Sequence, residues 1–166
     1  MWDIITPTHG ESPAEVETRR TTMLSGAYDH TLDDKGRVSL PAKHRGELGD
    51  TLMLLSGLDG QINVYPFSAW QKAAENMAGQ NQALKEARDL TRILYGASEC
   101  QVDRQGRILI PPVLRNRAHL DTDVVILGMH DHLEIWSQER WQEMMQRLDS
   151  EGSQIAEKMV GLGLRM

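Results

Sequence analysis

An internal repeat is the feature that most constrains the fold of this chain. Residues 33–45, DDKGRVSLPAKHR, align with residues 103–115, DRQGRILIPPVLR, at a constant offset of 70. The identical pairs are Asp33/Asp103, Gly36/Gly106, Arg37/Arg107, Pro41/Pro111 and Arg45/Arg115. After one inserted residue the match continues at an offset of 71, where Trp70 aligns with Trp141. Because the similarity extends this far, we interpret the chain as a tandem duplication whose copies share one fold.

Each copy is predicted to contain four short strands, a short helix and a longer helix. Alternating or β-branched apolar residues indicate the strands. They are expected at 28–32, 38–40, 51–55 and 62–65, and again at 99–102, 108–110, 124–127 and 133–136. A short helix should follow Pro41 and another should follow Pro111, because proline is tolerated in the first turn of a helix.

After its last strand, each copy has an apolar stripe with helical spacing. The stripes are Trp70, Ala73, Ala74 and Met77 in the first copy, and Trp141, Met144, Met145 and Leu148 in the second. We expect both stripes to pack in the core, with an oligomer interface as the alternative. Ser137 is a predicted N-cap, as is Ser68, which has Gln71 in the position of a capping box.

The duplication also predicts the domain organisation. Residues 25–80 and 96–150 should form two modules, joined by a linker helix within 81–95, and residues 151–166 should form a frayed helix or a subunit contact. Each copy has only about 60 residues, which gives a marginal core, so the apolar faces of the two halves should pack on each other. The predicted fold class is β-rich α+β with pseudo-twofold symmetry.

Composition excludes several classes of protein. The 166 residues are 40% hydrophobic and 25% charged, which allows a packed core. The longest apolar runs are about four residues, far too short to cross a membrane, and the N-terminus lacks the pattern of a secretory signal. Cys100 is the single cysteine. It excludes an intramolecular disulfide framework and a multi-cysteine zinc site, and it is consistent with a reducing cytosol.

Net positive charge is concentrated in the two repeated segments and diluted elsewhere. The chain carries a formal net charge of −6, yet residues 33–45 carry +2 and residues 103–117 carry +3, so the remainder carries −11. A net negative protein does not coat nucleic acid nonspecifically. Two basic segments on an acidic body instead indicate a localised anion-binding face.

The repeated motif Asp-x-x-Gly-Arg predicts a tight turn that orients an arginine. Gly36 and Gly106 fit the left-handed position of a three-residue hairpin loop. Asp33 could then accept the N–H groups of the turn and hold Arg37, with Asp103 and Arg107 in the same arrangement. A guanidinium oriented in this way pairs bidentately with guanine or phosphate. The alternative is a structural salt bridge that only closes the turn.

Further basic side chains are candidate phosphate contacts. They are Lys35, Lys43, Arg45, Arg104, Arg115 and Arg117. Arg45 and Arg115 lie one helical turn beyond the repeated prolines and could equally brace the hairpins.

Catalytic and metal-site patterns are weak. Cys100 lies at the edge of a predicted strand and is interpreted as a buried thiol. His130 and His132 are interpreted as part of a polar hairpin tip, because no further ligand cluster accompanies them. The sequence has no P-loop, dinucleotide fingerprint or serine-elbow motif. We therefore expect no enzyme activity, no metal and no cofactor.

The segment GAYDHTLDDKGRVSLPAKHR and the second motif DRQGRILIPPVLR closely resemble the MraZ family of bacterial transcriptional regulators. The resemblance implies two SpoVT-AbrB-type swapped-hairpin modules. It implies binding to double-stranded DNA at direct repeats in promoters of the division and cell wall gene cluster, including the protein's own operon. It also implies ring-like homo-oligomers and association with the nucleoid. The family's D-x-x-x-R motif falls on Asp33 and Arg37, and on Asp103 and Arg107. The alternative function is an AbrB-like antitoxin or an oligomeric protein-interaction module.

Residues 1–22 match nothing in the family pattern, which begins close to Met23. They are polar and contain four acidic residues and two arginines. They are either a disordered extension or the product of a mis-assigned start codon, and we favour Met23 as the initiator.

Overall fold

The computed structural model describes residues 23–164, so the alternatives for residues 1–22 lie outside the described part. Its strands are β1 (Ala27–Thr31), β2 (Arg37–Ser39), β3 (Thr51–Ser56), β4 (Ile62–Pro66), β5 (Ser98–Gln101), β6 (Arg107–Leu109), β7 (Asp123–Gly128) and β8 (Leu133–Ser137). Its helices are the 3-10 turn η1 (Ala42–His44), α2 (Arg45–Leu48), α3 (Phe67–Ala78), α4 (Lys85–Tyr95), α5 (Pro112–Arg117) and α6 (Gln138–Gly161). Every predicted strand is present, and both prolines precede short helices as expected.

The two copies exchange strands in one six-stranded antiparallel sheet. The strand order is β1-β7-β8-β4-β3-β5. The first strand of each copy therefore pairs with the other copy, β1 with β7 and β5 with β3. At the centre β4 pairs with β8, where Ile62 lies opposite Ile135. This exchange confirms the swapped-hairpin, α+β fold with pseudo-twofold symmetry.

A second sheet consists only of β2 and β6, one strand from each copy. Val38 lies opposite Ile108 at its centre. Both side chains are almost completely buried, with exposed fractions of 0% and 1%. Because side chains alternate along a strand, the neighbours of these two residues point away from the core.

One hydrophobic core serves both copies. Its fully buried side chains come from the first copy and the second in equal measure. They include Leu40, Leu52, Leu54 and Ile62, and Ile110, Ile126, Leu133 and Ile135. The halves therefore pack on each other as predicted. The exchanged strands make them inseparable, because removing either copy would expose half of this core.

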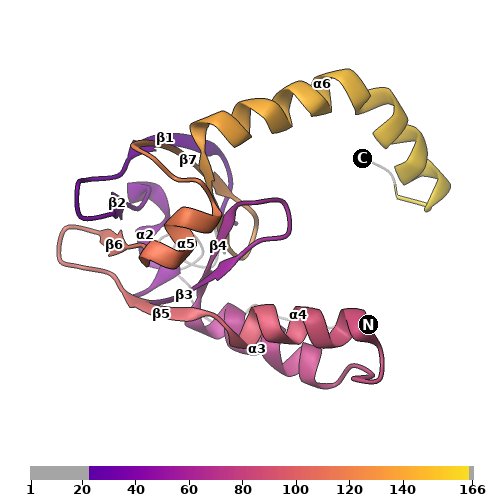
Figure 1. Ribbon diagram of the computed structural model, residues 1–166, viewed down its shortest axis with the longest axis horizontal. Helices are drawn as coiled ribbons and strands as arrows, with labels where there is room; N and C mark the ends of the chain where they lie inside the picture. The colour runs from indigo at the N-terminus through magenta and orange to yellow at the C-terminus, as the bar shows by residue number, and fades with distance from the viewer. Residues whose placement is uncertain (1–22, 165–166) are drawn as a thin grey trace, which may run out of the picture.

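Helices α3 and α4 form an antiparallel arm (Figure 1). The Trp70 indole N–H donates to the main-chain oxygen of Leu94 at 2.8 Å, and the ring meets the Tyr95 ring edge-on at 6.2 Å. Within the first apolar stripe Ala74 is buried, whereas Trp70, Ala73 and Met77 are half-buried. Ala73 and Met77 line a cavity between the arm and the sheet, so the expected core packing is confirmed only in part.

The second stripe differs from its prediction. Met145 and Leu148 on α6 are 40% and 37% exposed, and α6 has no buried residue. Trp141 meets Trp136 edge-on at 6.3 Å. The reason is that, up to residue 164, the second copy has no helix that folds back as α4 does. Instead α6 continues as one helix to Gly161, beyond the expected boundary at residue 150 (Figure 1). Within residues 23–164, no helix combines the length and apolar character needed to cross a bilayer.

The two predicted N-caps have opposite outcomes. The Ser137 hydroxyl accepts a hydrogen bond from the Arg140 main-chain N–H at 3.2 Å, so it caps α6 as predicted. Ser68 is not a cap, because α3 begins at Phe67 directly after Pro66 and Ser68 lies inside the first turn. Its expected partner Gln71 instead donates to Glu75 at 3.1 Å.

These caps provide a matched pair of substitutions. S137A should lower the free energy of unfolding by about 1 kcal/mol, because the first turn of α6 loses its acceptor. S68A should change it by less than ~0.5 kcal/mol, since the exposed Ser68 hydroxyl caps nothing. Urea denaturation followed by circular dichroism measures both values. Equal effects would contradict the assignment of the cap.

Candidate nucleic-acid interface

Each repeated motif forms the tight turn that the sequence predicts. The main-chain N–H of Gly36 donates to the main-chain oxygen of Asp33 at 3.0 Å, and the main-chain N–H of Asp33 donates to the main-chain oxygen of Arg37 at 2.9 Å. Gly36 has φ +83° and Gly106 has φ +75°, a conformation that favours glycine. However, the strands that flank each turn do not form the simple hairpin that the sequence predicts. Because of the exchange, β1 and β2 pair with β7 and β6 rather than with each other.

The aspartate of each turn holds the arginine four residues later. Asp33 Oδ1 accepts the main-chain N–H groups of Lys35 and Arg37 at 3.0 and 2.8 Å, and Asp33 Oδ2 accepts the Arg37 Nε–H at 2.7 Å. Asp103 repeats this with Gln105 and Arg107, and its Oδ2 accepts the Arg107 Nε–H at 2.9 Å. The arginines are therefore oriented before any ligand arrives.

These bonds also lower the pKa of both carboxyl groups. The main-chain N–H of Arg37 is the largest cause of the lowered pKa of Asp33. Desolvation opposes it, and the Arg37 guanidinium and the Lys35 N–H lower the pKa further. The pKa of Asp103 is lowered in the same way by Arg107 and Gln105. The charged form of each carboxylate is the one that the turn favours.

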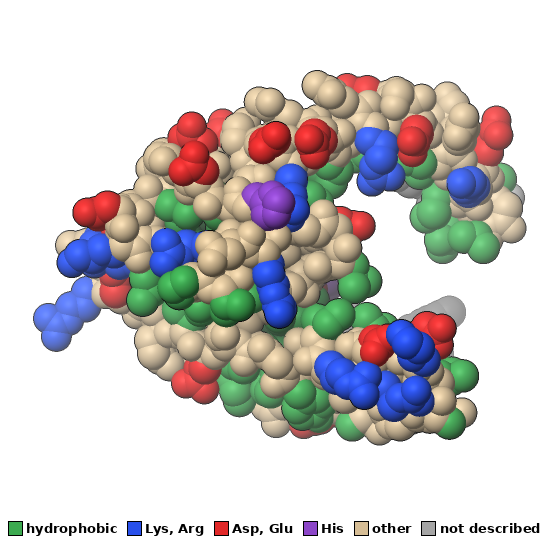
Figure 2. Space-filling view, viewed as in Figure 1, with side chains coloured by type: hydrophobic (Ala, Val, Ile, Leu, Met, Phe, Trp, Pro, Cys, Tyr) green, Lys and Arg blue, Asp and Glu red, His purple; other side chains and the backbone are tan. Residues whose placement is uncertain are grey.

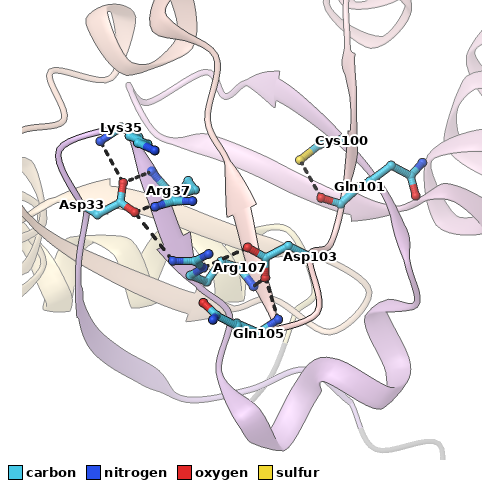
Figure 3. A network of polar contacts seen from close by, with 8 residues as sticks. All are labelled: Asp33, Lys35, Arg37, Cys100, Gln101, Asp103, Gln105 and Arg107. Atoms are coloured by element: carbon cyan, nitrogen blue, oxygen red, sulfur yellow. Dashed lines mark hydrogen bonds and ion pairs between the residues drawn. The ribbon is translucent and has the colours of Figure 1, made fainter.

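The two turns meet in one network on the protein surface (Figure 3). Arg107 Nη1 lies 4.0 Å from Asp33 Oδ2, so an arginine of the second copy reaches the aspartate of the first. The side chains of Arg37 and Arg107 keep 31% and 27% of their surface exposed. Both belong to the face of the β2–β6 sheet opposite Val38 and Ile108. The network lies at the end of the body far from the helical arms (Figure 1).

Arg45 and Arg115 brace the turns, and they do so across the copies. The Arg45 Nε–H donates to the Leu40 main-chain oxygen at 3.1 Å, and its guanidinium lies against Gly106. The Arg115 Nε–H donates to the Ile110 oxygen at 3.1 Å, and its guanidinium lies against Gly36. A Cβ on either glycine would come within 2.5 Å of the guanidinium carbon. The bracing alternative is thus observed, and phosphate contact by these two arginines stays a prediction.

The remaining predicted side chains lie on the two turns and the short helices, and Arg117 lines a separate pocket with Leu58 and Arg140. Lys35 and Arg104 are exposed on the two turns, while Lys43 and Arg117 are exposed on the short helices. Sequence reasoning missed Leu109, which is 53% exposed on the same outward face as the two network arginines. The alternation around the buried Ile108 was the signal that could have identified it.

The cysteine and histidine side chains considered in the sequence analysis make local contacts. The Cys100 thiol is buried and donates to the Leu109 main-chain oxygen at 3.6 Å, and its burial raises its pKa. A raised pKa makes the thiol a poor nucleophile. His132 contacts Asp131 at 2.7 Å and stacks on the Tyr65 ring. Within residues 23–164, no three His, Cys, Asp or Glu side chains are grouped as metal ligands would be.

The turn glycines predict a large difference between two alanine substitutions. G36A should destabilise the protein by at least ~1 kcal/mol, because it imposes a left-handed conformation on alanine and displaces the Arg115 guanidinium. G46A in α2 is the control, because its Cβ meets open space and alanine favours helix. It should be neutral or slightly stabilising in urea denaturation. Similar losses for both variants would contradict the double role of Gly36.

The lowered carboxyl pKa values predict how the turns respond to acid. Because folding favours the charged form, its contribution is complete above the ordinary pKa of 3.8 and is lost as pH falls through the lower folded value. The Nε–H resonances of Arg37 and Arg107 in ¹⁵N NMR should therefore hold their positions down to the ordinary value and move only below it. Movement in mildly acidic solution, well above the ordinary value, would contradict the geometry of the network.

Comparison with known proteins identifies the family. The family model described as MraZ protein, antitoxin-like, matches twice, over residues 23–93 and 93–162. A protein of Thermoanaerobacter pseudethanolicus named transcriptional regulator MraZ is 44% identical over 143 residues, which cover 86% of this chain and 100% of that protein.

Relatives of the same name give equivalent matches. The protein of Caldanaerobacter subterraneus is 45% identical over 82% of this chain and 96% of its own length. The protein of Moorella thermoacetica is 42% identical over 83% of this chain and 97% of its own length. These relatives are named as regulators of transcription and not as enzymes. With its two matched repeats and these relatives, the chain belongs to the MraZ family.

Proposed function

We propose that this transcriptional regulator binds double-stranded DNA in a sequence-specific manner through the surface that carries Arg37 and Arg107. The observation that carries the proposal is the joining of both Asp–Arg turns in one exposed network. Each guanidinium is held through Nε. This leaves the terminal nitrogens of Arg37 for a ligand, whereas Nη1 of Arg107 also lies 4.0 Å from Asp33 Oδ2. A planar fork of this kind pairs bidentately with guanine O6 and N7 in the major groove.

In this proposal the other basic groups set the position of the protein on the duplex. Lys35 and Arg104 on the turns, and Lys43 and Arg117 on the short helices, contact phosphates. Arg45 and Arg115 hold the opposite turns and add phosphate contacts. Asp33 and Asp103 act indirectly, by orienting the two base-reading arginines.

The charge distribution supports specific rather than nonspecific binding. Lys and Arg side chains extend from the end of the body that carries the turns, whereas acidic side chains lie along much of α6 (Figure 2). Nonspecific DNA binding is mostly electrostatic, so the acidic remainder of the chain opposes it. The base-reading contacts then decide where the protein binds.

The DNA target follows from the family resemblance. We propose direct repeats in the promoter of the division and cell wall gene cluster, including the protein's own operon, which makes the protein nucleoid-associated. One pair of turns supplies few base contacts, so several linked pairs on successive repeats would raise the effective concentration at each repeat. Binding should therefore depend steeply on repeat number and spacing.

The helical arms support self-association into a ring. A cavity of about 640 Å³ lies between α3, α4 and the sheet, and Leu58, Leu84 and Leu90 are among its lining residues. On the other arm α6 exposes its apolar stripe. The surface of α4 carries Lys85, Arg88 and Arg92, while α6 has more acidic than basic residues. We propose that α6 of one copy enters the cavity of the next, a head-to-tail contact that closes into a ring.

The antitoxin alternative also has one supporting observation. The family model is described as antitoxin-like, and the same α3–α4 cavity could accept an apolar segment of another protein. Recovery of a single stoichiometric partner other than this chain, bound through Leu58 and Leu84, would favour that function.

Substitution of the base-reading arginines tests DNA binding. R37A should weaken binding to a promoter fragment with direct repeats by about 1–3 kcal/mol and relax the preference for one guanine. R107A should do the same at a second guanine. K72A is the matched control, because Lys72 is exposed on α3, far along the chain from the turns, and its loss removes the same charge. Gel shifts with the repeats scrambled one at a time measure these effects. Binding by R37A and R107A equal to that of K72A would contradict the proposal.

The assembly contact has a separate test. L148E should shift the protein to smaller species in analytical ultracentrifugation, because it places a charge in the apolar stripe of α6. Q146E is the control, since Gln146 is exposed on the same helix outside that stripe. Ring species that persist in L148E would exclude α6 as the subunit contact.

A further inference from the structure

An exposed leucine lies on the same face as the two network arginines. Leu109 lies directly opposite Arg37 across the β2–β6 pair, and Arg107 precedes it by two residues on the same face. Its side chain is 53% exposed, at the end of β6 where this strand pairs with the first residue of β2. The Cys100 thiol donates to the Leu109 main-chain oxygen at 3.6 Å, and Ile108 and Ile110 on either side are buried. The leucine is therefore held outward by the sheet itself.

The first copy has no equivalent apolar group at this position. In the repeat, Leu109 aligns with Ser39, which lies opposite Arg107 on the same face. The two arginines and two aspartates follow the pseudo-twofold symmetry, but this pair breaks it. A symmetric surface would bind a DNA segment equally in both orientations. On the β2–β6 face, the Leu109/Ser39 pair distinguishes the two orientations; the turns also differ, at Asp34/Arg104 and Lys35/Gln105.

We infer that Leu109 contacts the C5-methyl group of a thymine next to the guanine read by Arg37. This inference rests on the proposed DNA binding. The thymine methyl is the apolar group that base edges present in the major groove. Side chains directly opposite each other on antiparallel strands are about 5 Å apart at Cβ, and adjacent base pairs are about 3.4 Å apart along the axis. Leu109 thus reaches the base pair beside the one that Arg37 contacts.

The inference also explains why an almost symmetric protein would recognise direct repeats. Each pair of turns reads guanine with both arginines but a thymine methyl at one end only, so each DNA repeat has a direction. Copies arranged head to tail in a ring present this direction repeatedly in the same sense. Repeats of one orientation would then be bound by successive subunits.

The test replaces each thymine of the promoter repeats with deoxyuridine, which removes the methyl group alone. The full chain should lose affinity about fourfold per substituted repeat at one thymine position, equivalent to ~0.8 kcal/mol for one buried carbon. L109S should show that loss on unmodified DNA and no further loss on deoxyuridine DNA. L109M, which keeps an apolar side chain, should retain the response. Fluorescence anisotropy gives each dissociation constant.

V113S is the control, because Val113 is an exposed apolar residue of the same copy outside the β2–β6 face. It should respond to the methyl group as the unaltered chain does. Repeat-dependent binding by the unaltered chain with no thymine sensitivity would overturn this inference and leave the proposed function standing. If L109S lost affinity on deoxyuridine DNA as the unaltered chain does, the inference about Leu109 would be overturned and the proposed function would stand. Failure of the unaltered chain to distinguish repeats from scrambled DNA would overturn both proposals.

Discussion

The exchange of strands between the two copies is the constraint on which the rest of the structure depends. Because β1 pairs with β7 and β5 with β3, neither copy has a complete sheet without the other. The exchange also brings β2 and β6 together, and this pairing places Asp33 of one copy within 4.0 Å of Arg107 of the other. The core and the candidate site therefore both depend on the strand exchange, and a substitution that disturbs one strand pairing should affect both.

The crossed contacts of Arg45 and Arg115 give the site its rigidity. Each guanidinium packs on the glycine of the opposite turn and also bonds to a main-chain oxygen at the end of its own strand. The turns carry charged side chains at the surface, yet both glycines beneath them are buried. A loop supported in this way presents Arg37 and Arg107 in a fixed geometry, so little conformational entropy would be lost in the proposed DNA binding. The helical arms lie at the other end of the molecule (Figure 1), so the proposed assembly would not compete with the proposed DNA surface.

Local chemistry explains which predictions from the sequence were correct. Alternation located all eight strands, and the Asp-x-x-Gly-Arg spacing predicted the turn, its left-handed glycine and its Asp–Arg bond, because these depend on neighbouring residues. Ser137 was a correct cap for the same reason. The prediction of Ser68 as a cap was wrong because β4 extends to Pro66 and α3 begins at once, which places the start of the helix two residues earlier than expected. The α6 stripe was placed wrongly in the core, because periodicity reports an apolar face and not what covers it.

By itself the sequence determined the duplication, the order of strands and helices, the turn chemistry and the two basic segments, all of which are encoded within short stretches of chain. Only the tertiary structure decided that the strands pair between copies and that Arg45 reaches Gly106. It also decided that α6 stays uncovered and that Leu109 lies opposite Arg37. These features join residues far apart in the chain. Their selection depends on which packing of two similar halves buries the most apolar surface, and that is a property of the whole fold.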